Sequence, residues 1–237
     1  MTNFNLENCK YDFASDNINI IVCLYDYSSS MGENTGAMRK ANQAFYDDFS
    51  KFEERGSIAI AKGRFADRFS MSTFDEVKNF DTTYYPDGNT ALYSSIVYAT
   101  QNTIEYYNEI IKRLNIRPKI TFLVFTDGED NRSQLYYSEA RDAIKQLNSL
   151  DATTVFVAFG AAIQKGDGES LGFSCIKTIN TAQELISCMG NELSKSCKEQ
   201  SKSAISLKSN FFSKADKNSQ EDVVTDQTVF ADDFFNV

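Results

Sequence analysis

The chain has 237 residues, of which 42% are hydrophobic and 24% are charged, and its formal net charge is −9. These values suit a protein with the core of one domain, whereas the acidity argues against a general nucleic-acid surface, which is usually basic. Histidine is absent, which excludes a Ser-His-Asp triad, a His-assisted cysteine nucleophile and His-ligated zinc built within this chain.

The first half of the chain alternates strand patterns with helical ones. Residues 18–25 are nearly continuous in large apolar side chains, which predicts a strand buried on both faces. Helical spacing of apolar residues follows over 38–52. Residues 57–65 and 68–73 predict two strands joined by a turn, as a hairpin or an edge pair. Helical spacing returns over residues 91–114.

The second half continues this alternation. Residues 119–126 and 153–159 are apolar runs that predict two further buried strands, and residues 138–150 predict a helix between them. A glycine-bearing loop is expected over residues 160–172. The pattern then ends with a short strand and a last helix, over residues 173–179 and 181–195.

Alternating strands and helices predict an α/β fold: a Rossmann-like, doubly wound and mostly parallel central sheet, flanked by helices, with one antiparallel edge strand. We assign residues 17–198 to this domain and residues 1–16 to an N-terminal extension. Residues 199–220, rich in Ser, Lys and Asn, are expected to form a flexible polar linker. Residues 221–237 hold five acids, no Lys or Arg, and several Val and Phe, which suits either a docking motif or a solvated tail.

The cysteines and the start of the chain indicate a compartment. An odd number of cysteines without a C-x-x-C pair is typical of reduced thiols in the cytosol. Residues 1–16 lack the basic and apolar regions of a signal peptide, and no run of about 18 apolar residues could span a bilayer. We therefore expect a soluble, cytoplasmic protein. The cysteines are Cys9, Cys23, Cys175, Cys188 and Cys197.

Three polar segments lie where such a sheet would present its ligand-binding edge, beyond the carboxyl ends of the strands. Asp26, Ser28 and Ser30 follow the first strand, Thr90 lies in a glycine turn before a helix, and Asp127 follows a buried strand. Each residue alone could be a helix cap or turn former. Their joint occurrence favours one metal site. Oxygen ligands with few carboxylates suit Mg²⁺, or Mn²⁺, better than zinc or copper.

This set resembles the von Willebrand factor A (VWA) domain family and its metal-ion-dependent adhesion site (MIDAS). The family's D-x-S-x-S pattern appears here as Asp26, Ser28 and Ser30. Its second-loop threonine corresponds to Thr90, and its third-loop T-D-G surrounds Asp127. The resemblance extends over most of the predicted domain, including the order of its helices and strands.

The residues and the resemblance agree on the roles in the site. Ser28 and Ser30 stand at alternate positions, so both hydroxyls can reach one ion, and Thr90 would add a third oxygen directly or through water. Asp26 and Asp127 would hold coordinated waters and orient the serines. Because Mg²⁺ dehydrates reluctantly, it suits a site completed by water.

The expected function is a metal-dependent protein-binding module, in which Mg²⁺ bridges to a Glu or Asp carboxylate of a protein partner. No catalytic residue, organic cofactor, nucleic acid or membrane is expected. One alternative is an accessory scaffold subunit whose residues 221–237 dock a partner. A metal-assisted phosphatase is less favoured, because Ser28 stands where a D-x-D pattern needs its second acid, and no Walker A or G-x-G-x-x-G sequence occurs.

Three further expectations concern the surroundings of the site. Tyr27 is expected to pack over the site or narrow it. Glu33, Glu129 and Asp130 are expected to be rim charges that tune specificity. Replacing Asp26 by alanine is expected to abolish partner binding without unfolding the domain.

Overall fold

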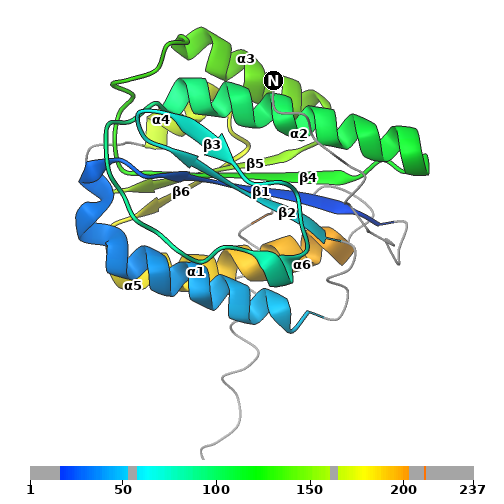
Figure 1. Cartoon of the computed structure of the whole chain (residues 1–237), viewed down its shortest axis with the longest axis horizontal. Coiled ribbons are helices and arrows are strands. Elements are labelled where there is room, and N and C mark those ends of the chain that lie inside the picture. Colours follow the sequence, from blue (N-terminus) through cyan, green and yellow to red (C-terminus); the bar gives the residue numbers. More distant parts are fainter. Residues whose placement is uncertain (1–16, 53–57, 161–164, 203–210, 212–237) are drawn as a thin grey trace, which may run out of the picture.

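A six-stranded sheet, in the order β3-β2-β1-β4-β5-β6, runs through the centre of the molecule (Figure 1). The computed structural model describes residues 17–52, 58–160, 165–202 and 211. All neighbouring strands are parallel except β2 and β3, which are antiparallel. The predicted fold class, a mostly parallel sheet with one antiparallel edge strand, is confirmed. The strands are β1 Asn19–Asp26, β2 Ile58–Phe65, β3 Phe69–Met71, β4 Lys119–Thr126, β5 Thr153–Phe159 and β6 Cys175–Ile179.

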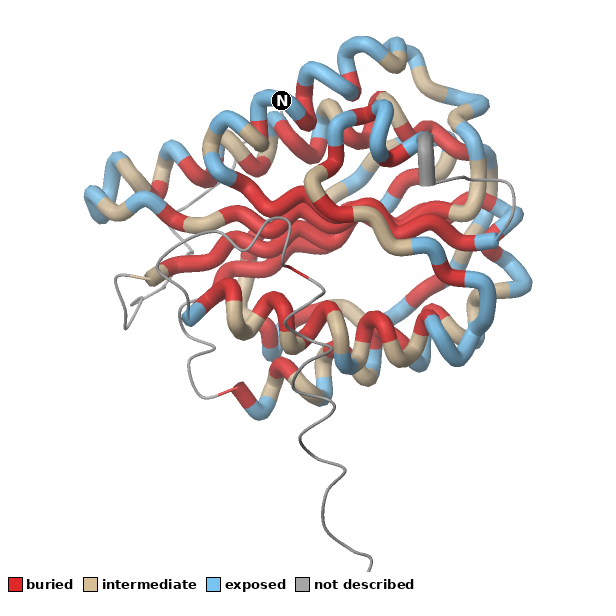
Figure 2. The backbone as a smooth tube through the Cα atoms, turned by 180° about the vertical axis from the view of Figure 1, so that it is seen from behind, coloured by how far each residue is buried: buried red, intermediate tan, exposed pale blue. Residues whose placement is uncertain are grey.

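Helices cover both faces of the sheet (Figure 1). Figure 2 shows that the buried residues gather in the sheet and on the helix faces turned toward it. One face is covered by α1 Thr35–Ser50, α5 Ala182–Ser187, the π-helical η5 Cys188–Leu193 and α6 Ser194–Lys202. The other is covered by α2 Leu92–Leu114, α3 Tyr137–Ser149 and α4 Lys165–Leu171. Two 3₁₀ helices, η2 Ser29–Asn34 and η4 Val77–Asn79, lie in the connections.

Strand β1 shows why its sequence is apolar at nearly every position. Ile21 and Tyr25 belong to the core on the α1 side of the sheet, whereas Ile20 and Leu24 belong to the core on the α2 side. Successive side chains of a strand point to opposite faces, so a strand covered on both faces buries both sets. The carboxyl end of β1 is thereby fixed in the centre of the sheet.

The expected loop at residues 160–172 is wrong in part, because it contains α4. Gly168 explains how this short helix fits. A Cβ on Gly168 would lie 2.9 Å from the ring of Phe156, so the absence of a side chain lets α4 approach the sheet closely. The two glycines in this helix lower its intrinsic helix propensity, so the sequence pattern predicted a loop instead of α4.

The last helical region also differs from the prediction, since it continues through η5 and α6 to Lys202. At the π-helical turn, a Cβ on Gly190 would lie 2.8 Å from the Cβ of Ala44 in α1. Two small residues thus allow the two helical segments to touch. The α1 helix begins at Thr35, three residues before its predicted start, after η2 has taken up the preceding polar loop.

Phe211 lies inside the expected linker, and its side chain is fully buried in the core on the α1 side. Its carbonyl oxygen accepts a hydrogen bond from Ser196 Oγ at 2.6 Å. The chain therefore contacts the domain again after α6. The expected N-terminal extension, the rest of that linker and the tail at 221–237 lie outside the described residues.

The thiols give a first testable prediction. Cys23, Cys175, Cys188 and Cys197 are buried, and burial raises the pKa of Cys23 and of Cys188 to about 12. Because the thiolate is the reactive form, we expect these four to resist a disulfide reagent in the native protein and to react in guanidinium. Counting modified cysteines by mass spectrometry checks this; native labelling at any of the four would contradict it.

Candidate metal centre

Asp26 is the last residue of β1, and its side chain is fully buried. Its Oδ1 accepts a hydrogen bond from the Ser28 backbone N–H at 2.8 Å, and its Oδ2 accepts one from Thr126 Oγ1 at 2.6 Å. Burial raises the pKa of this carboxyl, and the hydrogen bonds from Ser28 and Thr126 partly offset that rise. Both oxygens are thus engaged in holding the loop.

A row of side-chain oxygens leads from Ser28 to the third loop. Ser28 Oγ and Ser30 Oγ lie 2.9 Å apart, and Ser30 Oγ donates a hydrogen bond to Asp127 Oδ1 at 2.8 Å. Burial also raises the pKa of the Asp127 carboxyl, while the hydrogen bond from Ser30 lowers it. Ser28 is only 2% exposed, whereas Ser30 is exposed, so the row opens to solvent at Ser30.

Thr90, in the turn before α2, completes the set of predicted residues. A Cβ built on Gly128 would have Thr90 Oγ1 at 3.5 Å and Ser30 Oγ at 3.8 Å as its nearest neighbours. Gly128 therefore leaves a small space bordered by hydroxyls from two loops. All five predicted residues meet at the carboxyl edge of the sheet, and their role as metal ligands stays a prediction.

Backbone hydrogen bonds fasten the three loops to one another. The Ser29 N–H donates to the Gly88 carbonyl at 2.9 Å, and the Gly88 N–H donates to Ser29 Oγ at 3.0 Å. Gly88 has a φ of 103°, which glycine adopts without strain. The Asn131 N–H donates to the Thr90 carbonyl at 3.0 Å, and Asn131 Oδ1 accepts from the Thr90 N–H at 2.8 Å.

Sequence reasoning missed Ser29 and Asn131, because their side chains accept hydrogen bonds from backbone N–H groups of another loop, and such partners leave no pattern in the sequence. The only signal for Asn131 was its place after an Asp-Gly turn, where Asn commonly bonds nearby backbone. Ser29 carried no signal, since it stands between two candidate ligands.

The expectation of rim charges is wrong for Asp130. Its Oδ2 accepts a hydrogen bond from the backbone N–H of Tyr93 in the first turn of α2 at 2.8 Å, and its Oδ1 accepts from the Ser133 N–H at 3.1 Å. Asp130 thus satisfies a backbone donor at a helix start, which such ends otherwise leave free. Glu33 and Glu129 are exposed, as a rim position requires.

Tyr27 does not narrow the site, because its side chain turns into the core on the α1 side. Its ring packs on Tyr84 with centroids 4.5 Å apart, and its hydroxyl donates to the Thr83 carbonyl at 2.8 Å. The Tyr84 hydroxyl in turn donates to the Asp26 carbonyl. The two tyrosines thus stabilise the first loop from the core on the α1 side.

A buried lysine in β2 fixes the segment just before Tyr84. Lys62 is 3% exposed, and its Nζ donates hydrogen bonds to the carbonyl oxygens of Asp81, at 2.7 Å, and Thr83. The Asp81 carboxylate lies 3.7 Å away. Burial lowers the pKa of Lys62 to about 8, although Asp81 opposes this shift.

The donor set fits a small hard cation. It consists of three hydroxyls and two carboxylates, all oxygens, as Mg²⁺ prefers. In an octahedron with bonds of about 2.1 Å, neighbouring ligands stand about 3.0 Å apart, close to the 2.9 Å between Ser28 Oγ and Ser30 Oγ. Among the described residues, no group of three or more His, Cys, Asp and Glu is placed to hold a metal, so hydroxyls are essential to this candidate site.

No protein-family model matches the chain, and no curated protein matches it by sequence. Solved structures do match it. The von Willebrand factor type A protein from Catenulispora acidiphila aligns with a TM-score of 0.54 and 13% identity, over 78% of this chain and 42% of that chain. This chain has a VWA-like α/β fold.

Two other structures with the VWA-like fold show the range of proteins that carry it. The pilus adhesin SpaC from Lactobacillus rhamnosus GG aligns with a TM-score of 0.59 and 10% identity, over 77% of this chain and 31% of that one. Proximal thread matrix protein 1 from the mussel byssus, with a zinc-occupied MIDAS motif, gives 0.53 and 16%, over 76% and 46%. The chain thus spans about a third to a half of these neighbours.

Proposed function

We propose that this VWA-like domain is a protein-binding module that holds Mg²⁺ through Ser28, Ser30 and Thr90 and presents it to a Glu or Asp carboxylate of a partner protein. The observation that carries the proposal is the row of side-chain oxygens from Ser28 through Ser30 to Asp127, with the serine oxygens 2.9 Å apart, and the Thr90 hydroxyl beside the same small space at Gly128. Neighbours that include a pilus adhesin and a matrix protein with a MIDAS motif support a binding role.

The residues of the chain would divide the work in the following way. When bound, the ion supplies an electrophilic position that a carboxylate oxygen can complete. Asp127 accepts the Ser30 hydroxyl hydrogen, so Ser28 donates to Ser30 in the bond between the two serines, and the remaining Ser30 lone pair is turned toward neither partner and can face a cation. Asp26 keeps the first loop in place through Ser28 and Thr126. The three groups that would contact the ion directly are neutral hydroxyls, so the ion would keep its attraction for an incoming carboxylate.

Binding is favoured over catalysis because both carboxylates of the site already accept hydrogen bonds within it. The chain also has no histidine to serve as a general base. A cytoplasmic location is part of the proposal and is supported by the buried, unpaired thiols of Cys23, Cys188 and Cys197 among the described residues; the pilus and byssus neighbours do not support it. No helix in those parts of the chain is long and apolar enough to cross a membrane.

Filling the space beside Gly128 tests the metal site directly. In Gly128→Val, the new side chain would stand between Thr90 Oγ1 and Ser30 Oγ, so we expect affinity for Mg²⁺ or Mn²⁺ to fall at least about tenfold. Calorimetric titration measures this. The matched control is Gly36→Val, because a Cβ there meets nothing within 4 Å, and it should bind the ion normally. Equal affinities in the two variants would contradict the site.

Affinity capture from a cell extract then tests the partner interaction. Immobilised wild-type chain in Mg²⁺ is compared with wild type in excess chelator and with the valine variants at positions 128 and 36. Proteins captured by wild type and the position 36 variant should be lost in chelator and with the position 128 variant. Capture that persists in chelator would reject a bridging metal.

A further inference from the structure

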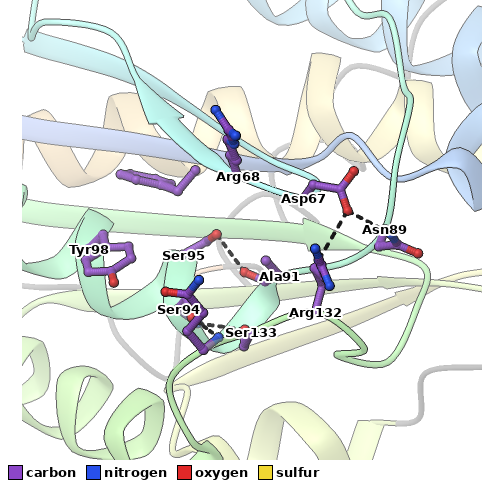
Figure 3. A pocket seen from close by; sticks show the side chains of 11 residues that line it. Asp67, Arg68, Asn89, Ala91, Ser94, Ser95, Tyr98, Arg132 and Ser133 are labelled. Carbon is purple, nitrogen blue, oxygen red and sulfur yellow. Dashed lines mark hydrogen bonds and ion pairs between the residues drawn. The ribbon is translucent and has the colours of Figure 1, made fainter.

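A groove of about 930 Å³ lies next to the candidate metal site (Figure 3). Asn89 and Ala91, on either side of Thr90 in the chain, both line the groove. The groove is therefore adjacent to the candidate metal site. Three segments form it: the turn between β2 and β3, the start of α2, and the third loop. Its lining includes Asp67, Arg68, Phe69, Tyr98, Arg132 and Ser133.

The charged residues that line the groove are two arginines and one aspartate, so its lining has a net positive charge on a chain that is acidic as a whole. Arg68 and Arg132 line it from opposite segments, and both are exposed. Arg132 is 62% exposed at its side chain and pairs with Asp67 at 3.6 Å, as Figure 3 shows. The side chain of Arg68 makes no hydrogen bond or ion pair with any residue that the structure describes. The groove therefore offers charge for an acidic ligand.

The same groove offers aromatic surface. Tyr98 is among the exposed large hydrophobic side chains of the described residues, and its ring lies 6.0 Å from that of Phe69. Both rings line the groove. A ligand that combines acids with apolar side chains would satisfy the arginines and cover the rings at once.

We propose that this groove binds the acidic-aromatic segment of the chain itself, residues 221–237. The segment carries five acids and no Lys or Arg, and three phenylalanines stand among those acids. Its composition matches both the charge and the aromatic surface of the groove. On a protein of net charge −9, a cationic groove is also where an acidic segment meets least repulsion.

The length of the chain permits this contact. Phe211 is the last described residue and is anchored in the core, and Asp233 follows 22 residues later. An extended stretch of that length spans at most roughly 73–79 Å. A compact domain of this size has a radius of gyration of about 16 Å, so the segment can reach any face.

The contact would also have a regulatory consequence. This consequence rests on the proposed function, but the contact between the segment and the groove is independent of it. A segment seated beside Asn89 and Ala91 would bring its carboxylates next to Thr90. It would then compete with the acidic residue of a partner for access to the metal edge.

Limited proteolysis of the full chain with chymotrypsin tests the contact, with cleavage inside residues 221–237 followed by mass spectrometry. Reversing the groove charges in Arg68→Glu/Arg132→Glu should speed that cleavage about threefold to tenfold. Adding Asp232→Arg/Asp233→Arg to this variant should restore slow cleavage. The difference between wild type and the groove variant should vanish in 1 M salt, where the Debye length is about 3 Å.

The matched control is Arg117→Glu/Lys145→Glu, which makes the same charge change at two exposed residues outside the groove. It should leave the cleavage rate at the wild-type value, and all variants should share the wild-type unfolding midpoint. Equal cleavage of wild type and the groove variant, or an equal effect of the control, would overturn the proposal.

Two more outcomes separate this proposal from its alternatives. Protection of the segment that rises with protein concentration would assign it to a second copy and overturn the intramolecular contact. Protection that chelator or Gly128→Val removes would place the segment on the metal instead of in the groove, and also overturns it. Failure of metal-dependent capture with the segment still protected would reject only the proposed function.

Discussion

Asp26→Ala is expected to abolish binding of Mg²⁺ and also to lower the free energy of unfolding by about 1–3 kcal/mol. The variant leaves the Ser28 N–H and the Thr126 hydroxyl without their buried acceptor, and an unsatisfied buried donor costs about 1–3 kcal/mol. Relief from burying a carboxylate near Asp127 opposes this loss. Calorimetric titration and guanidinium unfolding of the metal-free protein measure the two effects.

Ser30→Ala is the matched variant for this comparison. Ser30 is exposed, so its removal should weaken metal binding about tenfold or more while changing stability by less than about 1 kcal/mol. The expectation that Asp26→Ala abolishes binding without unfolding the domain stays a prediction, and the burial of Asp26 adds to it an expected loss of stability. Wild-type stability of Asp26→Ala, or normal metal affinity of Ser30→Ala, would contradict these assignments.

The free energy of unfolding of the wild-type protein is expected to rise, relative to that of Lys62→Met, as the pH increases from 8 to 10.5. Burial lowers the pKa of Lys62 to about 8 from 10.5, so within this window the unfolded chain holds more protons than the folded one. Stability then increases with pH. The difference between these two pKa values corresponds to roughly 3 kcal/mol, the cost of keeping the buried ammonium charged at pH 7.

The buried thiols, whose raised pKa values make stability fall above pH 9, contribute to both proteins, so most of their effect cancels in the difference between wild type and Lys62→Met; the charge of Lys62 also lowers the pKa of Cys23, but less than burial raises it. Guanidinium unfolding at pH 7, 8, 9 and 10.5 should show wild type gaining on the variant by up to roughly 3 kcal/mol. Lys145→Met, at an exposed position, should show no such trend. A difference that does not vary with pH would mean that Lys62 is not desolvated.

Strands β4 and β5 were predictable from the sequence to the residue, and β1 to within one residue. Both β4 and β5 are continuous apolar runs, and Pro118 marks the start of β4. The pattern failed where tertiary contacts outweigh propensity: α4 depends on Gly168 lying against Phe156, and the π-helical turn depends on Gly190 lying against Ala44. Neither contact leaves a local signal.

The candidate site divides in the same way. Asp26, Ser28, Ser30, Thr90 and Asp127 were found because their residue types and spacing express ligand chemistry, and the structure brings them together. The network that fastens their loops was not found, because each of its bonds has at least one backbone partner, and every residue possesses such groups. Asp130 was misassigned for a related reason: charge alone does not separate a solvated acid from one that accepts backbone hydrogen bonds.

The fastening of the three loops has a consequence for how the site comes into being. Ser29 and Gly88, and Thr90 and Asn131, join stretches that are far apart in the chain, and contacts of that kind form late because distant segments must first be brought together. A nascent or partly unfolded chain therefore cannot present the candidate site. Recognition through it would be restricted to molecules that have completed the sheet, so partner binding would itself report that folding is finished.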